Sequence, residues 1–127
     1  MSASRVAGLR TAARAALGCE PSEVVRPEST AELVEIVAES ARTGKSVIPW
    51  GGGNGQDYGH VPRSADLLLD TTGLGSVVAH EFADMTITVE AGVALSEVQA
   101  RLATRGQFLP LEPGDSASAT VGGMLAV

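Results

Sequence analysis

The stretch Val47-Ile48-Pro49-Trp50-Gly51-Gly52-Gly53-Asn54-Gly55 runs from strand-forming residues straight into a loop of glycines. We expect a strand over Ser46–Pro49, because apolar residues here precede a cluster of turn residues. Consecutive glycines accept positive φ, and several backbone N–H groups turned the same way form a concavity that binds anions such as phosphate. The simpler alternative is a flexible turn. The loop lacks both the residue order of a P-loop and the immediate helix of the dinucleotide fingerprint.

The residues before this strand predict another strand and a helix. Glu23–Arg26 is expected to be a short strand that Pro27 ends. Ser29-Thr30-Ala31-Glu32 has the spacing of a capping box, and Gly44 suits the position just after a helix. The apolar face of this helix is expected to consist of Leu33, Val34, Val37 and Ala41. Strand, helix and strand at this spacing form a βαβ unit, so the two strands are expected to be parallel.

The first 17 residues predict an amphipathic helix that Gly18 closes. Its inward face is expected to consist of Val6, Leu9, Ala13, Ala16 and Leu17. The segment contains three arginines and no acidic residue, which is also typical of a transit peptide. A secretory signal is not expected, because no apolar core of about 7–15 residues follows Arg5.

Further elements are predicted after the glycine loop. They are a buried strand over Asp66–Asp70, a short edge strand over Val77–Glu81, an alternating strand over Thr86–Glu90, a helix over Leu95–Thr104 that Gly106 ends, and a short strand at Phe108-Leu109. The expected fold class is α+β. A small parallel βαβ unit occupies residues 1–65, and residues 66–127 begin a second, mixed or antiparallel α+β unit.

A second segment near the end of the chain also has the composition of a binding loop. Pro110-Leu111-Glu112-Pro113-Gly114 is followed by Ser116, Ser118, Thr120 and then Gly122-Gly123. The prolines restrict the backbone, the hydroxyl groups can donate hydrogen bonds, and the glycines permit close approach by a charged or flat group. The alternative is a loop with a small-residue helix packed beneath it.

Composition and charge exclude several classes of function. The net charge is −6 without a basic cluster, which excludes a nucleic-acid binder. The single cysteine, Cys19, excludes an intrachain disulfide and favours a reducing, cytoplasmic setting. No apolar run approaches the ~20 residues of a membrane span. His60 and His80 lack the neighbouring ligands of a metal site. The segment of apolar and small residues at the end, Thr120–Val127, leads us to expect a truncated chain.

Taken together, the two glycine-containing segments carry a family resemblance. From Val25 to Ala126 the chain resembles the FAD-binding domain of the vanillyl-alcohol oxidase and p-cresol methylhydroxylase superfamily. Within it, the chain looks most like the FAD-binding subunit of glycolate oxidase and the related lactate dehydrogenases. The matching landmarks are Val25-Arg26-Pro27-Glu28-Ser29, Ile48 to Asn54, Asp70 with Leu74, Thr88 to Val93, Leu109 to Gly114 and Ala119 to Ala126.

The resemblance implies a cofactor, FAD, and two walls that hold its diphosphate and ribityl chain. The first wall would be Trp50, Gly51, Gly52, Gly53, Asn54 and Gly55, and the second Pro113, Gly114, Ala119, Thr120, Gly122 and Gly123. Covalent members carry a histidine in the first loop. Gly53-Asn54-Gly55 has none, so non-covalent FAD is expected. Trp50 departs from many relatives, and it could either flank the cofactor or be a packed indole.

The resemblance also implies an activity for the whole protein. It would be a flavin-dependent oxidase or dehydrogenase that transfers hydride from a 2-hydroxy acid, such as glycolate or lactate, to FAD. Catalytic residues and the substrate domain would lie beyond Val127. Possible partners are other oxidase subunits, including an iron-sulfur subunit, through which the protein could associate with a membrane. The alternatives are the FAD domain of a cell-wall precursor reductase or molybdenum hydroxylase subunit, and a non-enzymatic module that binds a phosphate ligand.

Overall fold

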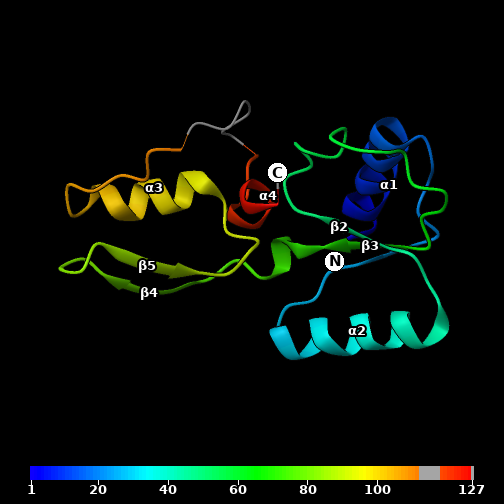
Figure 1. Cartoon of the computed structure of the whole chain (residues 1–127), viewed down its shortest axis with the longest axis horizontal. Helices are drawn as coiled ribbons and strands as arrows, with labels where there is room; N and C mark the ends of the chain where they lie inside the picture. Colours follow the sequence, from blue (N-terminus) through cyan, green and yellow to red (C-terminus); the bar gives the residue numbers. More distant parts are fainter. Residues whose placement is uncertain (112–117, 127) are drawn as a thin grey trace.

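The computed structural model describes residues 1–111 and 118–126, which form two sheets with associated helices (Figure 1). The elements in chain order are α1 (Ala3–Leu17), β1 (Glu23–Val25), α2 (Thr30–Thr43), β2 (Val47–Trp50), β3 (Leu67–Asp70), a 3₁₀ turn η1 (Thr71–Gly73), β4 (Val77–Glu81), β5 (Thr86–Val89), α3 (Leu95–Ala103) and α4 (Val121–Leu125). The predicted combination of a parallel and an antiparallel unit is confirmed.

The first sheet has the strand order β1-β3-β2, with all neighbours parallel. The predicted parallel strands β1 and β2 are therefore both present, but β3 lies between them. Every residue of β3 is buried, as is typical of a central strand covered on both faces. The expected division after residue 65 would separate β3 from the two strands it pairs with. The pairing thus joins β3 to β1 and β2 in one sheet.

Helices α1 and α2 lie on opposite sides of this sheet (Figure 1). On the α1 side, Leu68 packs against Trp50 and against Ala13 and Leu17 of the helix. The amphipathic helix predicted for the first 17 residues is confirmed, although Ala16 is exposed. Within the described residues no helix has the length and apolar character needed to cross a membrane.

Helix α2 begins and ends at the predicted residues but presents a different face to the sheet. The Ser29 hydroxyl accepts a hydrogen bond from the Glu32 backbone N–H at 3.2 Å, as in a capping box. Leu33, Ile36 and Ser40 are its buried or half-buried residues. Of the four residues expected to face the core, only Leu33 does so, because the row in contact with the sheet runs through Leu33 with spacings of three and four. The other three are Val34, Val37 and Ala41, and they are exposed.

The second unit is an antiparallel pair of strands, β4 and β5, covered by α3. Ile87 and Val89 of β5 face this helix, which confirms the predicted alternation. The strand expected at Phe108-Leu109 is absent. The side-chain amide of Gln99 instead occupies both backbone groups of Leu109: its Oε1 accepts from the Leu109 N–H at 3.0 Å, and its Nε2 donates to the Leu109 carbonyl at 2.6 Å.

A buried carboxylate closes the end of β3. Asp70 is fully buried and accepts hydrogen bonds from Arg5 Nε at 2.9 Å, Thr72 N at 3.1 Å and Thr72 Oγ1 at 2.6 Å. Arg26 Nε lies 3.8 Å from the same carboxylate. Burial alone would raise the pKa of Asp70, but the hydrogen bonds from Arg5 and Thr72, with the charge of Arg5, hold the pKa below its ordinary value. Asp70 is therefore ionised in the folded chain at neutral pH.

Replacement of this carboxylate should destabilise the fold in a pH-dependent way. We expect Asp70→Asn to lower the free energy of unfolding at pH 7 by about 1.5–3 kcal/mol, the usual contribution of a hydrogen bond to a charged group. Because the pKa of Asp70 is lower in the folded than in the unfolded chain, its contribution is fully present above the unfolded pKa of about 3.9. It is lost as the pH falls through the lower, folded value.

Denaturant unfolding of both proteins across the pH range from 7 to about 3 measures this difference. The gap in unfolding free energy between wild type and Asp70→Asn should narrow toward acid pH. Asp84→Asn, which removes the same charge from an exposed turn, is the matched control and should change stability little. A gap for Asp70→Asn that stays constant with pH would show that this carboxylate is not stabilised as an ion.

Candidate functional site

The two glycine-containing segments lie against each other, as expected of two walls that hold one cofactor. A Cβ atom added to Gly51 would overlap the Thr120 hydroxyl, and one added to Gly52 would overlap the Ser118 carbonyl. The Ser118 hydroxyl also donates a hydrogen bond of 2.7 Å to Asn54 Oδ1. The prediction that the segments are neighbours is therefore confirmed, and the absence of side chains at residues 51 and 52 is what allows the contact.

The first segment follows directly from β2, at the carboxyl end of the parallel sheet. Gly53 has a φ of 87°, and a Cβ there would lie 3.0 Å from the Trp50 indole. Trp50 is only 5% exposed and belongs to the core beneath α1. The indole thus packs between the core and Gly53 of the loop. This favours the alternative in which Trp50 is a packed core residue and does not flank the cofactor. Gln56 Nε2 donates to the Pro49 carbonyl at 3.1 Å and closes the loop back onto the strand.

The second segment runs beside the start of α3. Ala119 accepts a hydrogen bond from the Leu95 N–H at 2.9 Å, and Thr120 pairs with Ala94 in an isolated antiparallel bridge. Val121 and Gly122 donate to the carbonyls of Val93 and Ala91 at 3.0 and 2.8 Å. Thr120 Oγ1 accepts from the Gly123 N–H at 3.3 Å and so caps α4. This ladder holds the second segment firmly on the second unit while its other side contacts the glycine loop.

The structure places ten of the twelve residues predicted for the site. Trp50, Ala119 and Thr120 are buried, Gly51, Gly52, Gly53, Gly55 and Gly122 are half-buried, and Asn54 and Gly123 are exposed. Pro113 and Gly114 lie outside the described residues. All twelve are uncharged. An anion bound at this junction would therefore be held by backbone N–H groups and hydroxyls rather than by a cationic side chain.

Sequence reasoning missed the residues that support this junction. Thr71 Oγ1 donates to the Trp50 carbonyl at 3.2 Å, directly before the first glycine. Gly92 packs against the turn η1, so that a Cβ there would overlap the Thr71 carbonyl oxygen. Gly92 was marked in the sequence only as part of the family landmark Thr88 to Val93, and Thr71 carried no signal because its partner lies 21 residues away.

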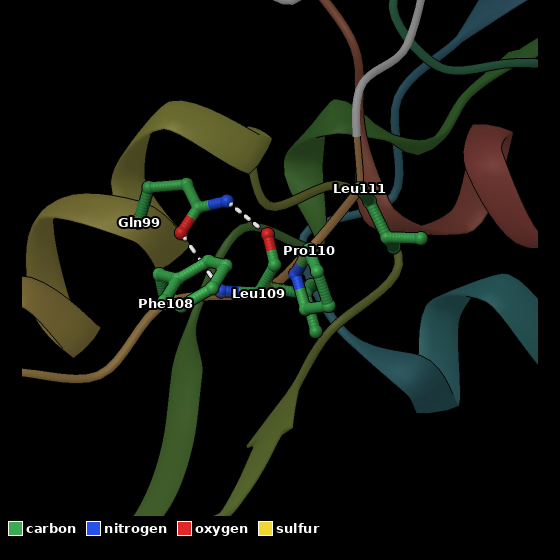
Figure 2. Close-up of a pocket in the computed structure, with 5 residues that line it drawn as sticks. All are labelled: Gln99, Phe108, Leu109, Pro110 and Leu111. Atoms are coloured by element: carbon green, nitrogen blue, oxygen red, sulfur yellow. Dashed lines mark hydrogen bonds between the residues drawn. The ribbon is translucent and has the colours of Figure 1, made fainter.

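A separate hollow of about 380 Å³ lies between the middle of α3 and residues 108–111 (Figure 2). It is lined by Gln99, Phe108, Leu109, Pro110 and Leu111, and the two hydrogen bonds between Gln99 and Leu109 cross it. Of the ten predicted cofactor residues that the structure describes, none lines this hollow. Its most prominent side chain, Phe108, is 75% exposed. The hollow is thus an open surface depression and not the junction of the glycine segments.

Known proteins are similar to this chain in both sequence and fold. L-gulono-1,4-lactone dehydrogenase of Mycobacterium tuberculosis is 33% identical over 87 residues, which is 68% of this chain and 20% of that protein. The mitochondrial D-lactate dehydrogenase (cytochrome) of Arabidopsis thaliana is 30% identical over 106 residues, which is 84% of this chain and 18% of that protein. The chain thus spans about a fifth of the length of the curated relatives it matches.

A solved structure, that of alkyldihydroxyacetonephosphate synthase, superimposes with a TM-score of 0.71 at 25% identity. The superposition covers 81% of this chain and 21% of that one. Residues 21–127 match the family described as FAD binding domain. The order of the strands, the two adjoining glycine segments and this match lead to one conclusion: the chain belongs to the family of FAD binding domains.

Proposed function

We propose that the junction of the two glycine segments is where this chain holds FAD. The first wall is formed by Trp50, Gly51, Gly52, Gly53, Asn54 and Gly55, and the second by Pro113, Gly114, Ala119, Thr120, Gly122 and Gly123. The observation that carries the proposal is the contact of Gly51 and Gly52 with Thr120 and Ser118. A hydrogen bond between Ser118 and Asn54, which are 64 residues apart in sequence, joins the two segments there as well.

The chemistry of these residues fits a diphosphate. Backbone N–H groups without neighbouring side chains let phosphate oxygens approach the main chain closely. Each good hydrogen bond to a charged oxygen contributes about 1.5–3 kcal/mol. The side chains of the junction are uncharged, so the chain contributes orientation and hydrogen-bond donors, while the bound flavin supplies the capacity to accept a hydride.

For the whole protein we propose an FAD-linked oxidoreductase that acts on a CH–OH group, with a 2-hydroxy acid such as lactate or glycolate as substrate. The similarity to a D-lactate dehydrogenase supports a hydroxy acid. The similarity to an L-gulono-1,4-lactone dehydrogenase supports a lactone as the second candidate. Because the same fold also occurs in a synthase, fold alone does not select between substrates.

The proposed setting is the cytoplasm, with possible attachment to a membrane through partner subunits, one of them an iron-sulfur protein. The single cysteine supports a reducing compartment. The name of the Arabidopsis relative places that protein in mitochondria. Fractionation of cells, with antibody detection of the whole protein, separates these locations.

Adding a single methyl group at Gly52 should weaken flavin binding. The new Cβ would overlap the Ser118 carbonyl and lie 3.4 Å from Ala119 N, so the two walls must separate. We expect Gly52→Ala to weaken FAD binding to the whole protein by at least about tenfold, equivalent to one hydrogen bond to a charged group. Quenching of flavin fluorescence measures the affinity.

Gly8→Ala is the matched control for this experiment. Gly8 lies within α1, and a Cβ there meets nothing within 4 Å. Alanine should stabilise that helix slightly and leave FAD affinity unchanged. A folded Gly52→Ala protein with wild-type affinity for FAD would remove the junction from the flavin site.

The flavin should be released intact when the whole protein is denatured. Gly53-Asn54-Gly55 contains neither histidine nor cysteine, the residues that could bond to the flavin ring. After precipitation with acid, we expect the yellow colour to remain in the supernatant. Flavin that stays in the washed pellet would contradict non-covalent binding.

The substrate class can be read from reduction of the bound flavin. Under anaerobic conditions, a 2-hydroxy acid should bleach the flavin absorbance of the whole protein. D-lactate, glycolate and L-gulono-1,4-lactone, each tested alone at the same concentration, distinguish the two candidate classes. Bleaching by the lactone and by neither hydroxy acid would replace the first proposal with the second.

A further inference from the structure

The turn η1 contacts the first wall of the junction directly and is linked to the second wall through Gly92 and Ala91. On one side, Thr71 Oγ1 donates to the carbonyl of Trp50, the residue before the glycine loop, at 3.2 Å. On the other, Gly92 packs on the Thr71 carbonyl, and its N–H donates to the Leu74 carbonyl at 2.8 Å. The neighbouring Ala91 carbonyl accepts from Gly122 of the second wall at 2.8 Å. A displacement of η1 would therefore move the two walls relative to each other.

The side chain of Asp70 fixes the turn. It accepts from the backbone N–H and the hydroxyl of Thr72, at 3.1 and 2.6 Å, and so caps the N-terminal end of η1. A fully buried carboxylate is stable as an ion only when cations and hydrogen bonds replace its water. The cap on η1 therefore depends on the cations that reach Asp70.

Of the two arginines near Asp70, Arg5 makes the closer contact. Its Nε lies 2.9 Å from the carboxylate, and its Nη2 donates to Thr72 Oγ1 at 2.6 Å. Arg26 Nε lies 3.8 Å from Asp70, and this arginine is shared with Glu28 at 3.5 Å. Arg5 belongs to α1, which precedes residues 21–127, the range matched by the FAD binding family.

We propose that Arg5 is a positioning residue for the flavin site: through Asp70 and the turn η1 it sets the relative position of the two glycine segments. The inference rests on the proposed location of FAD at their junction. Arg5 itself contacts Asp70 and Thr72 and not the walls, so its contribution to the site is indirect. Its packing residues, Ala13 and Leu17, lie in the later turns of the helix and hold it on the sheet independently.

Measurement of FAD affinity shows whether Arg5 positions the flavin site or only attaches α1 to the sheet. In the whole protein, Arg5→Ala should weaken FAD binding by about three- to tenfold, the effect of one lost hydrogen bond. Arg14→Ala removes the same charge from an exposed position of α1 and should bind FAD like wild type. Arg5→Lys keeps the charge and should recover part of the affinity. All affinities are measured well below the unfolding temperature of each variant.

A double-mutant cycle tests whether Arg5 acts through the turn. Thr71→Val removes the hydrogen bond to the Trp50 carbonyl, and Thr71→Ser retains it. If Arg5 acts through η1, Arg5→Ala combined with Thr71→Val should lose little more affinity than the weaker-binding single variant. If the double variant instead loses the product of the two fold-decreases in FAD affinity, the proposal is overturned. Equal FAD affinities for Arg5→Ala and Arg14→Ala would also overturn it.

A measurement made without flavin tests the positioning role of Arg5 independently of the proposed FAD binding. In amide NMR spectra of the 127-residue chain, Arg5→Ala should shift the signals of Gly51, Gly52 and Gly122, whereas Arg14→Ala should not. If wild-type protein binds no FAD, the proposed function fails, and these spectra still decide the positioning role. Unchanged glycine signals in Arg5→Ala would refute it.

Discussion

The carboxylate of Asp70, fully buried at the end of the central strand, is the constraint on which the rest of this structure depends. An ion in this position must be matched by cations and donors, because water cannot reach it. Those partners come from α1, from the residue after β1 and from η1. One charge thus ties together three segments that are far apart in the sequence, at the edge of the sheet where the glycine loop begins.

Backbone contact governs the junction of the two units more than side-chain chemistry does. Gly51 and Gly52 meet Thr120 and Ser118 at distances that no side chain would allow. The second segment is held by a ladder of hydrogen bonds to residues 91–95, and the first continues from β2. The geometry between them is therefore set by the supports of each segment, since none of the twelve wall residues has a charged side chain.

Local patterns in the sequence predicted most elements, and long-range pairing decided where the predictions failed. The capping residues of α2 and the alternation of β5 depend on neighbouring residues and were predicted correctly. The inward face of α2, the place of β3 between β1 and β2, and the clamp of Gln99 on Leu109 depend on distant partners. Asp70 looked like a strand-end residue, because its cation Arg5 lies 65 residues earlier. The two walls could be named from the family resemblance, whereas Thr71 could not.

The buried indole beneath the glycine loop gives the chain an internal optical reporter. Trp50 is the single tryptophan, and it contacts both the α1 core and the underside of Gly53. Its emission spectrum therefore reports the exposure of the indole to solvent at the place where the helix, the sheet and the loop meet. Opening of the loop and undocking of α1 expose the same ring, so the two motions are registered by one fluorophore without any label.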